Sequence, residues 1–166
     1  YNFTVFDKAG NSKVVSYAVS NIDLTAPGKP TIDLSTAAWT NGNVTFTIIP
    51  GTDSQSGVAY TQYQIDGGAW TNYTGVVTIS TNGKHVINAR TTDNVGWTGV
   101  TETKTASIDK VVPTAGISVN TSWTNATSVA ATLTASDADS GLSNVKYQLS
   151  GATTKAETTA TTGDVI

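Results

Sequence analysis

The sequence predicts an all-β protein built from β-sandwiches, and three features of its composition favour that class. Val and Ile together number 27 of the 166 residues, against five Leu and no Met. β-Branched side chains pack well on a pleated sheet and lose rotamer freedom in a helix, so this excess favours strands. Ten Asp against two Glu indicate many turns, because Asp readily bonds its own backbone whereas Glu is the better helix former. No window of the sequence has a helical apolar period.

The chain also contains an internal repeat of 84–86 residues. Three motifs recur 84 residues apart, namely Trp39-Thr40-Asn41 at 123–125, Ser56-Gly57 at 140–141 and Tyr63-Gln64 at 147–148. A second set recurs 86 residues apart, in which the Asp-x-x-Gly of 7–10 matches 93–96, and Ile22-Asp23 with Pro27 matches Ile108-Asp109 with Pro113. Fixed spacings of this kind indicate a tandem array of one structural unit.

The repeat boundaries divide the chain into three parts. Residues 1–24 are expected to form the C-terminal hairpin of one repeat, residues 25–110 one complete repeat, and residues 111–166 the N-terminal part of a following one. We therefore expect one complete sandwich flanked by two partial ones, within a longer tandem array. The alternative is that the leading hairpin of one chain completes the trailing half of the next, which would make a head-to-tail filament.

Within the complete repeat, strands are expected at short alternating or β-branched runs between turn residues. Val44–Ile48 alternates apolar and polar side chains with a period of two, which is typical of a half-buried strand. Further strands are expected at 31–34, 59–65, 69–73, 76–80, 85–91 and 99–108. Asp66-Gly67 predicts a turn, and Asn82-Gly83 predicts a hairpin between its two flanking strands. About seven short strands per repeat describe an immunoglobulin-like sandwich. Its expected core is Val44, Phe46, Ile48, Tyr63, Ile65, Trp70, Ile79, Ile87 and Ala89.

Three motifs of the complete repeat carry a resemblance to a known family. They are Tyr-Gln-Ile-Asp-Gly-Gly-Ala-Trp at 63–70, Asp-x-x-Gly at 93–96 and Ile-Asp-x-x-x-Pro at 108–113, and Asn-Ile-Asp-Leu-Thr-Ala-Pro at 21–27 matches the same pattern. In these motifs the chain resembles the tandem bacterial Ig-like (Big-type) repeats of secreted and surface-attached proteins. The resemblance implies an extracellular, stalk-forming or adhesive role, in some cases with calcium at the joints between modules.

Asp residues at equivalent repeat positions are candidate metal ligands. In a sandwich of this topology the incoming linker, the loop after the second strand and the loop before the last strand lie at the same end, so Asp23, Asp53 and Asp93 are expected to converge. Three carboxylates with backbone carbonyls and water would satisfy Ca²⁺. At the second joint the same reasoning selects Asp109 and Asp137, with Asp139 as a further candidate. The alternative is ordinary turn chemistry, in which Asp bonds its own backbone.

The aromatic residues allow a second hypothesis, carbohydrate binding by ring stacking. However, Trp39 and Trp123 share a repeat position, as do Tyr63 and Tyr147, which favours a role in the core. Trp97 stands in a loop where the preceding copy has Asn11. We expect Trp97 to pack on the neighbouring module.

Composition disfavours several classes of function. A net charge of −3 and eight dispersed Lys argue against nucleic acid or an anionic membrane surface as a partner. No stretch approaches the roughly 20 apolar residues of a membrane helix. Cys is absent and His85 is the single His, so neither a thiolate site nor a His-based triad is expected. We predict that the protein is not an enzyme.

These observations together predict a non-catalytic spacer segment of an extracellular bacterial surface or filament protein. Its partners would be neighbouring Ig-like modules of the same or an adjacent chain, with Ca²⁺ as a candidate at the joints. The alternative is a carbohydrate-binding or adhesive module that recognises glycans through exposed aromatics. The repeated joint residues favour the spacer, because a rod must join successive modules at one angle, and Pro in short linkers restricts the backbone.

Overall fold

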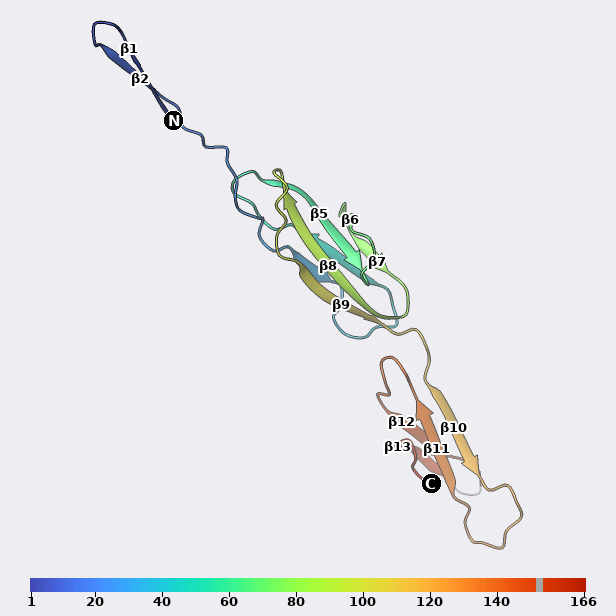
Figure 1. The fold of residues 1–166 in the computed structure, drawn as a ribbon. Coiled ribbons are helices and arrows are strands. Elements are labelled where there is room, and N and C mark those ends of the chain that lie inside the picture. The colour runs from blue at the N-terminus through green and yellow to red at the C-terminus, as the bar shows by residue number, and fades with distance from the viewer. Residues whose placement is uncertain (152–153) are drawn as a thin grey trace. The chain divides into compact units, whose positions relative to one another are not determined.

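The computed structural model describes residues 1–151 and 154–166, and every regular element within them is a β-strand (Figure 1). The all-β prediction is confirmed. Within these residues there is no helix with the length and apolarity that crossing a membrane would require. The chain forms two compact units, described separately here. Residues 1–35, 45–77 and 85–105 belong to the first, and residues 36–44, 78–84 and 106–166 belong to the second.

The first element is a two-stranded antiparallel hairpin. It consists of β1 (Asn2–Phe6) and β2 (Ser12–Ser16), with Phe3 opposite Val15. All ten residues of the two strands are exposed. The hairpin therefore holds together through its backbone ladder and its turn, without a buried apolar face.

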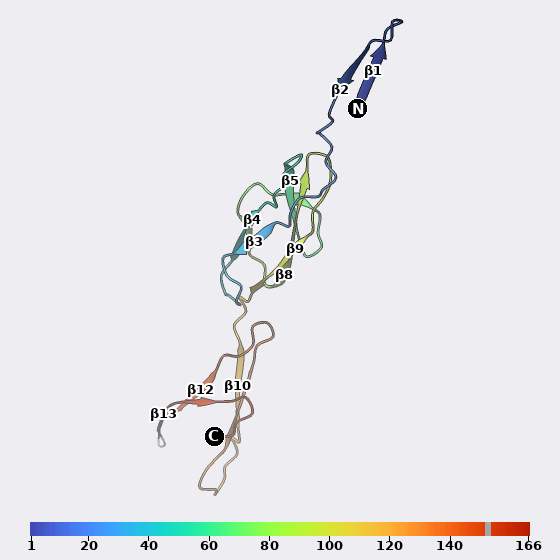
Figure 2. The ribbon, with the colours of Figure 1, turned by 90° about the vertical axis from the view of Figure 1, so that its left-hand side faces the viewer.

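Seven strands between residues 31 and 108 form two sheets (Figures 1 and 2). The three-stranded sheet has the order β3-β4-β7, and the four-stranded sheet has the order β6-β5-β8-β9. This arrangement is consistent with the predicted sandwich. The strands are β3 (Thr31–Leu34), β4 (Val44–Ile49), β5 (Val58–Ile65), β6 (Thr71–Asn72), β7 (Val77–Ile79), β8 (Gly83–Asp93) and β9 (Glu102–Ile108).

The two predicted turns of this region differ in outcome. Asp66 and Gly67 both have positive φ, 53° and 73°, as a type I′ hairpin turn requires, and they join β5 to its antiparallel partner β6. The hairpin predicted at Asn82-Gly83 is wrong, because β7 pairs with β4 in one sheet whereas β8 pairs with β5 in the other. The turn instead carries the chain from one sheet to the other, which lets Ile79 and Ile87 both be buried.

The core is formed by alternate apolar residues of both sheets. Predicted core residues that are buried are Val44, Phe46, Ile48, Ile79, Ile87 and Ala89. Tyr63, Ile65 and Trp70 are only half-buried. Tyr63 packs edge-on against Phe46, with ring centroids 5.5 Å apart. Trp70 lies beside the edge strand β6. The guanidinium of Arg90 lies over its ring, with Cζ 4.0 Å from the ring centroid.

The C-terminal part contains two separate two-stranded antiparallel sheets. β10 (Thr114–Val119) pairs with β11 (Ala131–Ser136), and β12 (Val145–Leu149) pairs with β13 (Lys155–Ala160). Burial here is limited, and the buried apolar residues are Ala131, Leu133 and Ala160.

Lys110, in the linker after β9, connects that linker to two loops of the second unit. Its backbone N–H donates to the Asn82 side chain at 2.6 Å. Its Nζ donates to the Asn43 side chain at 2.8 Å and to the Ser80 carbonyl at 2.6 Å. These bonds hold the linker against the loops before β4 and before β8. The repeat boundaries at 24/25 and 110/111 remain a prediction from the sequence.

The packing predicts a large stability loss for Phe46→Ala. Phe46 is 1% exposed, and truncating a fully buried Phe typically costs about 3–5 kcal/mol through lost burial and the cavity that remains. Thermal and urea unfolding followed by circular dichroism would measure the loss. Tyr60→Ala removes a comparable ring from an exposed position of β5, so a similar loss for both variants would contradict this core.

Candidate metal centre

Three carboxylates from separate segments converge in the first unit. Asp23 lies in the linker before β3, Asp53 lies in the loop between β4 and β5, and Asp93 ends β8. One carboxylate oxygen from each lies within 4.8 Å of the other two. The predicted convergence is confirmed, and the group could hold a metal ion.

The two carboxylate oxygens of Asp93 have different surroundings, since one takes part in a turn and the other belongs to the cluster. Its Oδ1 accepts hydrogen bonds from the backbone N–H groups of Val95 and Trp97, both at 2.9 Å. Its Oδ2 is buried and has no hydrogen-bond partner among the residues that the structure describes. The whole residue is 2% exposed. A buried carboxylate oxygen without a donor is unfavourable unless a cation or water satisfies it.

Asp53 organises the loop that faces Asp93. Its Oδ1 accepts from the backbone N–H groups of Gln55 at 3.0 Å and Gly57 at 2.8 Å. The Asn94 side chain donates to the Ser56 carbonyl at 2.8 Å. This last bond joins the Asp53 loop to the Asp93 turn, so the two carboxylates keep a common position.

Asp23 connects the linker to the same loop. Its Oδ1 accepts from the Thr25 backbone N–H at 3.0 Å, and its Oδ2 accepts from the Ser56 backbone N–H at 3.1 Å. The pKa of Asp23 lies below its ordinary value, with the Ser56 side chain as the largest cause and the Thr25 N–H next. The Ser56 hydroxyl makes no hydrogen bond of standard geometry, so its backbone N–H is the donor that the structure defines.

The cluster holds three acidic groups in a small and largely enclosed volume. Asp23 and Asp93 are buried and Asp53 is half-buried. Within the described residues, none of the three forms an ion pair with a basic side chain. Like charges at this separation repel strongly where water is scarce. Backbone N–H groups offset part of this repulsion, and a bound cation would offset the rest.

Close backbone packing holds the linker in place beside the cluster. The Gly28 N–H donates to the Thr52 carbonyl at 2.8 Å. A Cβ on Gly51 would lie 1.7 Å from the Gly28 carbonyl oxygen, so position 51 accepts only glycine without a shift of the backbone. The Trp97 indole N–H donates to the Asp23 carbonyl at 3.3 Å. Hydrogen bonds to the Asp53 loop and from the Asp93 turn thus both hold the linker.

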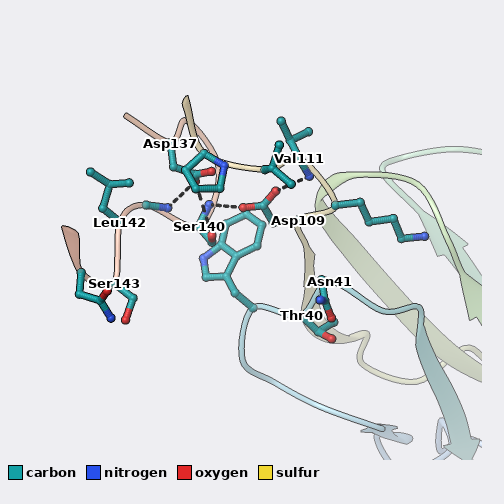
Figure 3. Close-up of a pocket in the computed structure, with 14 residues that line it drawn as sticks. Thr40, Asn41, Asp109, Val111, Asp137, Ser140, Leu142 and Ser143 are labelled. Carbon is teal, nitrogen blue, oxygen red and sulfur yellow. Dashed lines mark hydrogen bonds between the residues drawn. The ribbon is translucent and has the colours of Figure 1, made fainter. Parts of the chain in front are cut away.

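The second linker repeats this pattern in the second unit. Asp109 Oδ1 accepts from the Val111 N–H at 3.0 Å, and its Oδ2 accepts from the Ser140 N–H at 3.0 Å. Asp137 Oδ1 accepts from the Gly141 N–H at 2.8 Å. The pKa of Asp109 is lowered, first by the Ser140 side chain and then by the Val111 N–H. Figure 3 shows Asp109 between Val111 and Ser140, with Asp137 beside them.

Asp139, the further candidate at the second linker, contacts the loop before β8. Its carboxylate accepts a hydrogen bond from the Asn82 side chain at 2.6 Å. Among the residues that the structure describes, Asp109, Asp137 and Asp139 do not form a three-carboxylate cluster of the kind seen at Asp23, Asp53 and Asp93. The second linker therefore reproduces the hydrogen bonds of the first without a third converging carboxylate.

A hollow of about 460 Å³ lies next to Asp109 in the second unit (Figure 3). Trp39, Thr40 and Asn41 line one part of it, and residues 140–144 line another. Trp39 is half-buried. The hollow thus combines an aromatic ring with amide and carboxylate groups.

Trp97, Trp123 and His85 differ in their exposure and in their contacts. Trp97 is half exposed but bonded to the linker, whereas Trp123 is fully exposed. The expectation that Trp39 and Trp123 share a core role is therefore wrong for Trp123, because no described segment covers its ring, and Trp39 is itself only half-buried. His85 Nδ1 lies 2.7 Å from Asp66 Oδ2, and this pair joins the β5–β6 turn to β8.

Sequence reasoning found the three carboxylates but missed the donors that hold them. The backbone N–H groups of Ser56 and Ser140 reach the linker carboxylates in the two copies. The repeated Ser-Gly pair was the available signal, since the repeat equivalence of Ser56 and Ser140 is plain. The bond from the Trp97 indole to Asp23 had no signal beyond the position of Trp97 in a loop.

Comparison with known proteins adds no relative. No protein-family model matches the chain, and a search of curated proteins finds no match.

The lowered pKa of Asp23 predicts acid sensitivity of the first unit. A carboxyl whose folded pKa lies below the ordinary 3.8 contributes stability in full above that value, and the contribution is lost as the pH falls through the lowered pKa. In calcium-free buffer, the melting temperature of the native chain should therefore drop between about pH 4 and pH 2 more steeply than that of Asp23→Asn. Asp33→Asn, at an exposed position of β3, is the control. Parallel profiles for the native chain and Asp23→Asn would contradict the assignment.

Proposed function

We propose that this chain is a non-catalytic spacer segment of an extracellular bacterial surface or filament protein, with calcium-stiffened joints between Ig-like modules. The observation that carries the proposal is the repetition of the linker geometry. Asp23 and Asp109 each accept one backbone N–H from their own linker and one from the Ser of the following loop. The corresponding distances agree within 0.1 Å.

Repetition of the linker bonds favours a spacer over a binding module. A binding module needs loops that differ between copies, and its linkers need only be flexible. A rod needs each linker to meet the next loop in the same way, because the angle between successive modules depends on it. The close backbone contact at Gly28 and Gly51 also restricts the first linker. Neighbouring modules of the same or an adjacent chain are the partners that this role requires.

The chemistry of the cluster favours calcium among metal ions. All three side-chain ligands are carboxylates, and hard oxygen ligands suit Ca²⁺ or Mg²⁺ rather than Zn²⁺ or Cu²⁺. The three ligand oxygens lie within 4.8 Å of one another, so one ion of either kind could contact all three. Within residues 1–151 and 154–166, the buried Oδ2 of Asp93 has no hydrogen-bond donor, which leaves it available to a metal ion. Calcium would join the linker, through Asp23, to both loops of the sandwich.

The extracellular bacterial location rests on the resemblance to tandem Ig-like repeats. The composition agrees with such a setting, since charged residues are only 13% of the chain and Thr and Ser supply 46 residues. Thr is well suited to exposed sheet faces, where its methyl group packs and its hydroxyl contacts water.

Calcium should stabilise the native chain, and the effect should depend on Asp93. A ligand that binds only the folded state adds about 2.7 kcal/mol at one hundred times its Kd, so the melting temperature should rise with calcium and return with chelator. Calorimetric titration should show binding that Asp93→Asn abolishes and Asp33→Asn preserves. Binding unchanged in Asp93→Asn would remove Asp93 from the site, and an unchanged melting temperature would overturn the calcium proposal.

Calcium should also restrict the linker. In small-angle X-ray scattering, the maximum dimension should differ between calcium and chelator, because the linker is freer without the ion. An unchanged maximum dimension together with an unchanged melting temperature would leave a spacer whose joints need no metal.

Glycan binding is the second candidate, favoured by the hollow beside Trp39. Its lining offers an aromatic face with Asn41 and Asp109, the groups that a sugar ring and its hydroxyls require. A glycan array probed with the native chain would detect it. Binding that is lost on Trp39→Ala or Trp97→Ala would replace the spacer function with a carbohydrate-binding one.

A further inference from the structure

The four-stranded sheet of the complete sandwich has an outer face that the proposed spacer function does not use. Its strands β6, β5, β8 and β9 lie side by side (Figure 1). In β8, Ala89 and Thr91 are 0% exposed and belong to the core, so Arg90 between them lies on the opposite face. The register places Gln62 of β5 opposite Arg90, and Asn72 of β6 opposite Gln62. Further residues of the same face are Tyr60, Gln64, Asn88 and Thr103.

Arg90 is held in one orientation by neutral groups. Its guanidinium carbon lies 4.0 Å from the centroid of the Trp70 ring, and its Nε and Nη2 donate to Gln62 Oε1 at 3.2 and 2.9 Å. In the described part of the chain no carboxylate forms an ion pair with it.

The two bonds to Gln62 occupy one edge of the guanidinium and leave another. The second edge consists of Nη1 and the remaining N–H of Nη2, and within residues 1–151 and 154–166 it has no hydrogen-bond partner. A guanidinium edge of this kind takes a carboxylate through two parallel N–H···O bonds. Arg90 is therefore a preorganised cation whose carboxylate-binding edge is unused.

Arg90 also fixes the direction of the amides beside it. A guanidinium has no acceptor, so Gln62 must turn its oxygen to Arg90 and its Nε2 group away. That Nε2 group donates to Asn72 Oδ1 at 3.0 Å, which leaves the exposed Asn72 with its Nδ2 group at the end of the chain of bonds. On the other side of β8, Asn88 Oδ1 accepts from the Thr103 hydroxyl at 2.7 Å. Amide oxygens are thus used within the face, and N–H donors remain for a ligand.

The charge of this face indicates the chemical class of its ligand. The net charge of the chain is −3, yet the named residues of the face include one cation and no carboxylate. One guanidinium among neutral donors fits a polymer that carries single carboxylates separated by hydroxyl groups. An acidic peptide or a polyphosphate, with many adjacent charges, would need several cations. Tyr60 is 45% exposed and offers a ring on which a sugar can pack.

We propose that the outer face of β5, β6 and β8 binds an acidic polysaccharide, with a sugar carboxylate on the Nη1–Nη2 edge of Arg90. Sugar hydroxyl groups accept from the Nδ2 groups of Asn72 and Asn88, and a sugar ring packs on Tyr60. The site uses neither the acidic cluster nor the hollow beside Trp39. It gives a spacer module a contact along its side, and it does not depend on calcium.

Oligogalacturonate, in which each sugar ring carries one carboxylate, is the probe. In calorimetric titration with chelator present, Arg90→Lys should weaken binding about tenfold, because Lys keeps the charge but loses the paired N–H groups. Lys104→Gln is the control, since it removes a positive charge from an exposed position of β9 and should leave the Kd within about twofold. A native chain that does not bind, or equal weakening by the two substitutions, would overturn the proposal.

A second pair of variants tests the amide donors without disturbing the fold. In Asn72→Asp a carboxylate oxygen can still accept from Gln62, but the Nδ2 donors are replaced by a charge that repels the ligand. Binding should fall at least tenfold, with the melting temperature unchanged. Asn125→Asp makes the same change of charge in an exposed loop and should bind like the native chain. Equal loss in both variants would indicate attraction by overall charge alone and would contradict the site.

Two further ligands and one spectrum identify the class and the place. Methyl-esterified oligogalacturonate and oligoglutamate should each bind at least tenfold more weakly, because the first lacks the charge and the second lacks the sugar ring. In NMR spectra, oligogalacturonate should shift the side-chain N–H signals of Arg90, Asn72 and Asn88. Equal binding of the ester would exclude the carboxylate contact, and equal binding of oligoglutamate would make the ligand an acidic peptide. Shifts confined to the Trp39 indole would place the sugar in the hollow, and each of these results would overturn the proposal.

Discussion

The structure depends most on one interaction, the hydrogen bonding of a linker carboxylate to a loop that follows it in the chain. A linker has no sheet ladder to satisfy its backbone groups, so its course must be determined by other contacts. Asp23 supplies them by accepting the Thr25 N–H on one oxygen and the Ser56 N–H on the other. Asp109 does the same with Val111 and Ser140. The carboxylate thereby holds the linker against the loop.

The acidic cluster of Asp23, Asp53 and Asp93 follows from that interaction. Asp23 is held at the Asp53 loop, and Asn94 joins this loop to the Asp93 turn. These two contacts bring the three carboxylates close together. Turn formation and metal binding are then compatible uses of the same residues. In Asp53 and Asp93 the Oδ1 atom accepts the hydrogen bonds that shape the turn. The Oδ2 atom of Asp93 is buried and has no donor in the described part of the chain. A role in the turn therefore uses one carboxylate oxygen and does not compete with metal binding by the other.

The N-terminal hairpin shows which part of a β-structure local hydrogen bonds can form. The hairpin keeps its ladder and its Asp7 turn although all of its strand residues are exposed. Local hydrogen bonds are therefore enough to shape a hairpin, whereas burial needs strands from elsewhere in the repeat. The same reasoning explains Trp123, which has the repeat position of Trp39 but no described segment over its ring. Repeat position therefore does not by itself predict burial, which depends on the segments that pack over each side chain.

The sequence by itself determined the all-β class, most strand positions and the convergence of Asp23, Asp53 and Asp93. These are properties of local pattern and repeat spacing, in which β-branched alternation specifies strands and equivalent loops recur together. Only the tertiary structure decided that Asn82-Gly83 crosses between sheets, that Asp139 bonds to Asn82 and that Trp97 contacts the linker. A turn sequence specifies a change of direction without specifying which sheet receives the next strand, because the pairing partner is set by burial of distant apolar residues. In the same way, the donors of Ser56 and Ser140 are backbone N–H groups, which every residue except proline carries, so the repeated Ser-Gly pair marks the equivalent positions without specifying the bond.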